Sequence, residues 1–145
     1  MPESGGEPAG PREVLARFQQ TAIDKSLDAM AELFADDAVL EFPFTRPGIP
    51  SRLAGRAEIA DFMRANWERS PLRYRAYRNV VVHDTGDPEV VIVEEEATGT
   101  AATTGQDFAL PHIAVLRVRD GHIVHFRDYV NVLAAAEASG RPLPS

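Results

Sequence analysis

The chain contains no cysteine among its 145 residues. It therefore has no disulfide framework, thiolate zinc site, iron–sulfur cluster or cysteine nucleophile. Long apolar runs are also missing, since no stretch approaches the roughly 20 residues of a membrane-spanning helix. The opening segment, MPESGGEPAG, lacks the basic and apolar regions of a signal peptide. We therefore expect a cytoplasmic protein with no membrane partner.

Positive charge is scarce in this chain. Fifteen basic residues are set against 22 acidic ones, which gives a formal net charge of -7. Nucleic acids are bound through clustered positive charge, so we expect no nucleic-acid partner. The histidines show no HExxH motif or paired ligand spacing, and neither a glycine-rich phosphate loop nor a GxSxG motif is present. We therefore expect no metal and no cofactor.

The periodicity of apolar residues predicts a single α+β domain. Residues 1–10 are expected to be a disordered tail, and residues 11–145 to form the domain. Helical spacing is found in segments 11–22, 27–35, 56–69 and 132–139. Strand patterns cover 38–44, 72–83, 89–101, 107–119 and 123–131, with a long loop over 43–55. This order predicts an antiparallel sheet whose one face is covered by helices.

The face of the sheet away from the helices is predicted to be unusually apolar. It should carry four large side chains: Ile113, Val115, Ile123 and Tyr129. An exposed apolar patch of this kind indicates a homodimer formed through the outer sheet face. The alternative is an amphipathic outer face in a monomer.

The last predicted strand contains a carboxylate in an apolar row. Alternation places Asp128 on the same face as Val124, Phe126 and Val130. A carboxylate removed from water must find hydrogen-bond partners, or its pKa rises toward the range where it can exchange protons. Asp128 is therefore the first candidate for a catalytic residue.

Two turns compete at the start of this strand. A two-residue Asp-Gly loop would set the charged Arg117 on the face of Asp128. A three-residue loop, with Gly121 left-handed in a bulge, keeps Arg117 outside and matches the apolar rows. Because the apolar match favours the three-residue loop, we predict that His112 lies directly across from Asp128.

An imidazole beside a carboxylate is suited to proton transfer, although such a pair can also simply close a sheet. Glu95 is a third candidate, because alternation places it on the same face; the alternative is a solvated strand. An apolar pocket for an aromatic or cyclic ligand is predicted near these residues. Its expected lining, which could equally be ordinary core, is Phe18, Leu40, Phe42, Phe44, Phe62, Trp67, Ala97, Ala114, Leu116 and Phe126.

Three segments carry a resemblance to a known family: LFADDAVLEFPF at 33–44, RPGIPSRLAGRAEI at 46–59, and VLRVRDGHIVHFRDYVNVLAAAEASG at 115–140. They resemble SnoaL-like proteins of the ketosteroid isomerase and nuclear transport factor 2 superfamily. The resemblance implies a cone-shaped, curved antiparallel sheet wrapped by three N-terminal helices, followed by a short C-terminal helix. It also implies a pocket between sheet and helices, and commonly a homodimer.

The resemblance does not extend to the residues of ketosteroid isomerases. The base of those enzymes falls at the position of Phe42, and their oxyanion-hole residues fall at Phe18 and Ala114. In epoxide-hydrolase-like members the last aspartate of an Asp-Arg-Asp triad matches Asp128, but the triad's other two members align with Glu95 and Ala97. These departures argue against both chemistries.

The resemblance to phenazine-biosynthesis A/B-type proteins and polyketide cyclases is stronger. The former place a catalytic glutamate where Asp128 stands, and the latter rely on an aspartate acid/base with a nearby histidine. This resemblance implies a cofactor-free isomerisation, cyclisation or condensation of an apolar cyclic metabolite, with Asp128 as general acid/base, His112 as its partner and Glu95 in support. The alternatives are a non-catalytic ligand-binding or scaffold protein, and an epoxide hydrolase-like activity.

Overall fold

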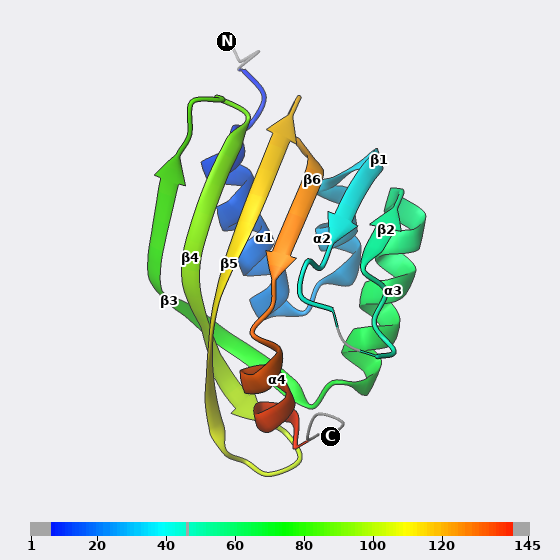
Figure 1. Cartoon of the computed structure of the whole chain (residues 1–145), viewed down its shortest axis with the longest axis vertical. Coiled ribbons are helices and arrows are strands. Elements are labelled where there is room, and N and C mark those ends of the chain that lie inside the picture. The colour runs from blue at the N-terminus through cyan, green and yellow to red at the C-terminus, as the bar shows by residue number, and fades with distance from the viewer. Residues whose placement is uncertain (1–6, 46, 141–145) are drawn as a thin grey trace.

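A computed structural model describes residues 7–45 and 47–140 of the chain (Figure 1). The helices are α1 (Pro11–Asp24), α2 (Leu27–Glu32), α3 (Arg56–Arg69) and α4 (Val132–Ser139). The strands are β1 (Phe34–Glu41), β2 (Arg52–Ala54), β3 (Leu72–Asp84), β4 (Val90–Ala101), β5 (Asp107–Arg119) and β6 (His122–Tyr129). Most of the predicted disordered tail lies outside the described residues. No described helix is long and apolar enough to cross a membrane.

The strands form one curved sheet in the order β2-β1-β6-β5-β4-β3. Neighbouring strands are antiparallel except β1 and β6, which run parallel. The helices α1, α2 and α3 lie on one side of the sheet, and α4 follows the end of β6 (Figure 1). This arrangement confirms the predicted α+β fold.

The inner face of the sheet is buried against the helices in one large core. Its centre includes Phe34, Met30, Ile59 and Leu116, each no more than 2% exposed. Complete burial of such a side chain contributes about 1.5–3 kcal/mol. The helices are held against the sheet by this apolar contact, since α1 and α3 each present a buried apolar stripe to it.

The boundary between α2 and β1 differs from the prediction. The helix was expected to continue to residue 35, but it ends at Glu32, and Phe34 already belongs to β1. Phe34 pairs with Ile123 of β6, and the Ile123 amide donates a hydrogen bond to the Leu33 carbonyl. Pairing with a distant strand therefore overrides the local helical spacing. The predicted loop over 43–55 likewise contains the short strand β2, which buries Leu53.

The predicted register of the last hairpin is wrong. Asp120 and Gly121 form a two-residue turn with φ of 52° and 79°, the left-handed values that a tight hairpin needs. This turn pairs Val118 with Ile123. A bulge then follows in β6, because the next pair after Val118 and Ile123 joins Arg117 to His125.

The bulge restores the predicted face but not the predicted partner. Phe126 lies across from Leu116, and Asp128 lies across from Ala114 rather than His112. Asp128 therefore faces inward, as alternation predicted, with His112 two residues further along the neighbouring strand. The same bulge turns Ile123 into the core, where it is 0% exposed, so its predicted place on the outer face is wrong.

Candidate active site

The centre of the candidate site is an ion pair that bridges β4 and β5. Glu95 lies directly across from His112, and its Oε2 is 2.7 Å from His112 Nε2. Glu95 is 8% exposed, and among the described residues it is the one charged residue that is buried. The strand register therefore gives His112 a different partner from the one predicted, and it gives Glu95 a place inside the protein.

Both partners of this pair make a second contact. Gln19 of α1 donates a hydrogen bond from Nε2 to Glu95 Oε1 at 2.5 Å. His112 Nδ1 lies 3.3 Å from the carbonyl oxygen of Leu110. Burial opposes charge on His112, but the hydrogen bond to Glu95 and the negative charges of Asp128 and Glu95 outweigh it, so the pKa of His112 is raised. The imidazolium form is therefore favoured.

Asp128 lies beside the pair and keeps part of its surface exposed. Desolvation raises its pKa from 3.8 to about 6. The positive charge of His112 opposes this rise, and the negative charge of Glu95 adds to it. A carboxyl group with this pKa is populated in both protonation states close to neutral pH, so it can act as an acid or as a base.

Two tyrosines of β3 complete the polar cluster. Burial raises the pKa of Tyr74 to about 12 and raises that of Tyr77 as well, and the negative charge of Asp128 contributes to both shifts. Both phenols therefore stay protonated at neutral pH. Their rings stack with centroids 6.4 Å apart, and Tyr74 also meets Phe108 edge-on at 5.8 Å. An aromatic wall thus stands next to the titratable groups.

Three residues of the site were not predicted from the sequence: Gln19, Tyr74 and Tyr77. The tyrosines are three positions apart, so strict alternation would put them on opposite faces of β3. A shift of register at residue 75 brings both inward, Tyr74 across from Gly99 and Tyr77 across from Ala97. No pattern in the sequence predicts such a bulge, and the contact of Gln19 depends on how α1 packs on the sheet.

Most of the predicted pocket residues lie together between the inner face of the sheet and the helices that cover it. Leu40, Ala114, Leu116 and Phe126 are buried in the large core, and Phe18, Phe42, Phe62 and Trp67 pack against it while partly exposed. Ala97 belongs to a second apolar cluster beside Tyr74 and Tyr77. Phe44 lies apart from the others: it is 60% exposed, and its ring meets Tyr129 at 5.6 Å.

A hollow of about 620 Å³ borders the Glu95–His112 pair. It extends along the end of β6 and the start of α4, with Phe44, Tyr129 and Leu133 among its lining residues. Leu133 is 69% exposed and Ile113, also in the lining, is 44% exposed. The surroundings of the pair therefore include exposed apolar side chains.

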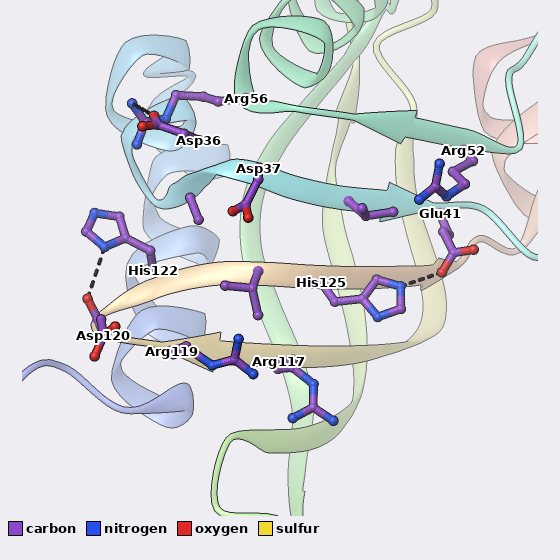
Figure 2. A pocket seen from close by; sticks show the side chains of 13 residues that line it. Asp36, Asp37, Glu41, Arg52, Arg56, Arg117, Arg119, Asp120, His122 and His125 are labelled. Atoms are coloured by element: carbon purple, nitrogen blue, oxygen red, sulfur yellow. Dashed lines mark hydrogen bonds and ion pairs between the residues drawn. The ribbon is translucent and has the colours of Figure 1, made fainter.

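A second hollow, of about 810 Å³, is lined by charged side chains of β1, β2, β5 and β6 (Figure 2). His125 and Arg117 lie opposite each other there, on the sheet face away from the core. His125 is hydrogen-bonded to Glu41, and Arg117 pairs with Asp87 and Glu89. Within residues 7–45 and 47–140, no group of three potential ligands could hold a metal ion. His125 and Arg117, two of the basic residues of this hollow, are therefore each paired with acidic side chains.

Comparison with known proteins agrees with this architecture. An uncharacterized PhzA/B-like protein of Pseudomonas aeruginosa is 34% identical over 129 residues, which cover 89% of either chain. The crystal structure of a candidate isomerase from Bacillus subtilis superposes with a TM-score of 0.82 and 31% identity, over 92% of this chain and 95% of the other. A candidate polyketide cyclase from Xanthomonas campestris gives a TM-score of 0.70 and 25% identity, over 88% and 95%.

The family assignment rests on the sequence as well as on the fold. The SnoaL-like domain family matches residues 6–126, a range that includes α1, the whole sheet except the end of β6, and the Glu95–His112 pair. The structure neighbours, a candidate isomerase and a candidate polyketide cyclase, share the same fold. The chain therefore belongs to the SnoaL-like domain family, as the resemblance of its motifs implied.

Proposed function

We propose that the protein is a small-molecule enzyme in which Asp128 is the general acid/base. The observation that carries this proposal is the pKa of about 6 for a partly exposed carboxyl group beside a buried ion pair. Catalytic proton transfer is most effective when the pKa of the group lies near the working pH. Perturbed carboxyl groups in such surroundings are more frequent at functional sites than elsewhere.

The proposed reaction moves a proton within an apolar cyclic substrate. Ionised Asp128 removes a proton from a carbon next to a carbonyl group, and the electron pair of the broken C–H bond shifts onto the carbonyl oxygen as an enolate. Protonated Asp128 then returns the proton at another carbon, which completes an isomerisation. Attack of the enolate carbon on a second carbonyl carbon instead forms a carbon–carbon bond, and the π electrons of that carbonyl move onto its oxygen. Protonated Asp128 then gives its proton to this alkoxide, which completes an aldol-type cyclisation, and loss of water from the product makes the reaction a condensation. Neither route consumes an oxidant or a reductant.

The other groups of the site have supporting roles in this proposal. The protonated phenols of Tyr74 and Tyr77 can donate hydrogen bonds to a developing oxyanion. His112, held by Glu95, places a positive charge near Asp128 and keeps its ionised form accessible. The aromatic wall of β3, together with Phe18 on α1, favours a flat or cyclic apolar ligand. The isomerase and cyclase assignments of the structure neighbours favour the same reaction class.

The proposal is tested with a simple cyclic ketone. Conversion of cyclohex-3-enone to the conjugated cyclohex-2-enone is followed by ultraviolet absorption with the wild type, Asp128→Asn and Asp61→Asn. Asp61 is a matched control because its carboxylate is 83% exposed on α3. Turnover should fall at least about a hundredfold in Asp128→Asn, the usual contribution of a general acid/base, and stay unchanged in the control. An unchanged rate in Asp128→Asn contradicts the proposal.

A non-catalytic ligand-binding or scaffold protein is the second candidate, because Phe42, Phe18 and Ala114 replace the residues of ketosteroid isomerases. A non-catalytic protein would bind cyclic ketones without turnover, in the wild type as well as in both variants. An epoxide hydrolase-like activity is less well supported. The charged groups that shift the pKa of Asp128 are His112 and Glu95, and no described arginine is among them.

We also propose a homodimer formed through the outer sheet face. Ile113 is 44% exposed there and pairs with Tyr129, and the exposed Val81 of β3 lies in the same row beyond Glu94. The face has acidic residues on β4, such as Glu94, and basic residues on β5 and β6, so a two-fold axis can bring opposite charges together. Light scattering should give twice the chain mass for the wild type and the chain mass for Ile113→Asp. A monomeric wild type contradicts the dimer.

A further inference from the structure

A continuous chain of hydrogen-bonding groups runs from α1 through the candidate site to β5. It begins at Gln19 Nε2, which is 2.5 Å from Glu95 Oε1. It continues from Glu95 Oε2 to His112 Nε2 at 2.7 Å, and ends where His112 Nδ1 meets the carbonyl oxygen of Leu110 at 3.3 Å. The helix α1 and two consecutive strands, β4 and β5, therefore meet at one buried carboxylate.

The two ends of this chain fix the position of its hydrogens. A carbonyl oxygen only accepts, so His112 Nδ1 must carry a hydrogen and donate it to Leu110. An amide nitrogen only donates, so Glu95 Oε1 must accept from Gln19. If the side-chain amide of Gln19 were flipped, its oxygen would face the carboxylate oxygen of Glu95, and the two would repel each other. A single hydrogen then remains between Glu95 Oε2 and His112 Nε2.

The position of that hydrogen decides the charges at the centre of the site. On Nε2 it gives an imidazolium and a carboxylate; on Oε2 it gives two neutral groups. A hydrogen bond from Gln19 stabilises the carboxylate, because charge-assisted hydrogen bonds are about twice as strong as neutral ones. Burial opposes the charged pair, since the side chains of Glu95 and His112 are only 6% and 18% exposed. The donated hydrogen bond therefore matters more here than at the surface.

We propose that Gln19 is a positioning residue that keeps Glu95 and His112 charge-separated and thereby sets the proton balance at Asp128. Gln19 acts through Glu95 and need not touch the substrate. The titratable groups that face Asp128 are Glu95 of β4, His112 of β5, and the tyrosines at positions 74 and 77 of β3. Of these, His112 carries the charge that favours ionised Asp128. The inference rests on the proposed function only in one respect, namely that the proton balance at Asp128 serves catalysis.

The test reads the protonation of His112 directly. Gln19→Met removes the donor and nearly keeps the volume. Gln20→Met is the matched control, because Gln20 is exposed on the same helix and donates its hydrogen bond to Asp24, away from the ion pair. Imidazole ¹⁵N shifts at pH 7 report whether one or both ring nitrogens carry hydrogen. The ratio of imidazolium to neutral His112 should fall about tenfold or more in Gln19→Met, as expected for loss of one hydrogen bond to a charged group. It should stay unchanged in Gln20→Met.

A second variant keeps the inference testable if Gln19→Met does not fold. Gln19→Lys retains an N–H donor to Glu95 and should keep His112 in the imidazolium form. The midpoint of the Asp128 carboxyl ¹³C titration should rise in Gln19→Met and not in Gln19→Lys. An unchanged imidazolium ratio in Gln19→Met, or a lower ratio in Gln19→Lys, overturns the inference. These readouts need no substrate, so they fail independently of the Asp128→Asn rate measurement that tests the proposed function.

Discussion

Replacement of Asp128 by asparagine should make the protein more stable at neutral pH while it removes the proposed acid/base. The folded protein holds the Asp128 proton with a pKa of about 6, and the ordinary value is 3.8. Between these values the folded state binds more protons than the unfolded chain, so stability falls as pH rises through this window. Above pH 6 Asp128 is ionised in the folded protein, and the full free-energy cost of that buried charge lowers the stability. That cost is about 3 kcal/mol, since one pKa unit corresponds to 1.36 kcal/mol.

Asparagine has nearly the shape of a protonated aspartate but does not ionise. Urea denaturation at pH 8 should therefore give Asp128→Asn a free energy of unfolding about 1–3 kcal/mol above that of the wild type, the upper figure being the full ionisation cost. The difference should shrink toward zero near pH 4. Asp61→Asn is the control and should stay within about 0.5 kcal/mol of the wild type at both pH values. An equal or lower stability of Asp128→Asn at pH 8 refutes the reasoning.

Three further substitutions test the fold and the ion pair by urea denaturation. Gly99→Ala should cost about 3 kcal/mol, because a Cβ there would lie 1.9 Å from the Arg73 carbonyl oxygen, and a wild-type stability would contradict this packing. Phe34→Ala should cost about 3–5 kcal/mol, because the ring is 0% exposed, and a loss below about 1 kcal/mol would argue against its central place in the core. His112→Ala should cost about 3–5 kcal/mol at pH 7, because it leaves the buried carboxylate of Glu95 without its ion partner; a neutral effect would show that the pair does not form.

The sequence predicted those elements whose signals are local. α3 begins at Arg56 and ends at Arg69, as the apolar spacing and Pro71 indicated, and β5 covers the predicted 107–119. The end of α2 was predicted too late, because helical spacing continues through Phe34 while pairing with β6 draws that residue into the sheet. Long-range pairing of this kind leaves no local signal.

Only part of the candidate site could be predicted, because its geometry also depends on pairing between strands that are distant in the sequence. Alternation correctly placed Asp128 and His112 on the inner face, but their separation depended on the turn at Gly121 and on the bulge that follows it. Glu95 was predicted as a possible third member, and the register of β4 with β5 makes it the direct partner of His112. Gln19 reaches the site only through the packing of α1, which no spacing in the sequence reveals.

The central claim is that Asp128 exchanges protons close to neutral pH. The most direct measurement is a ¹³C NMR titration of the Asp128 carboxyl carbon in the wild-type protein, assigned by the loss of its signal in Asp128→Asn. A midpoint near pH 6 is the result that burial beside the Glu95–His112 pair predicts. A midpoint at or below the ordinary value of 3.8 would contradict the account, because Asp128 would then be fully ionised near neutral pH and could not serve there as the proposed acid.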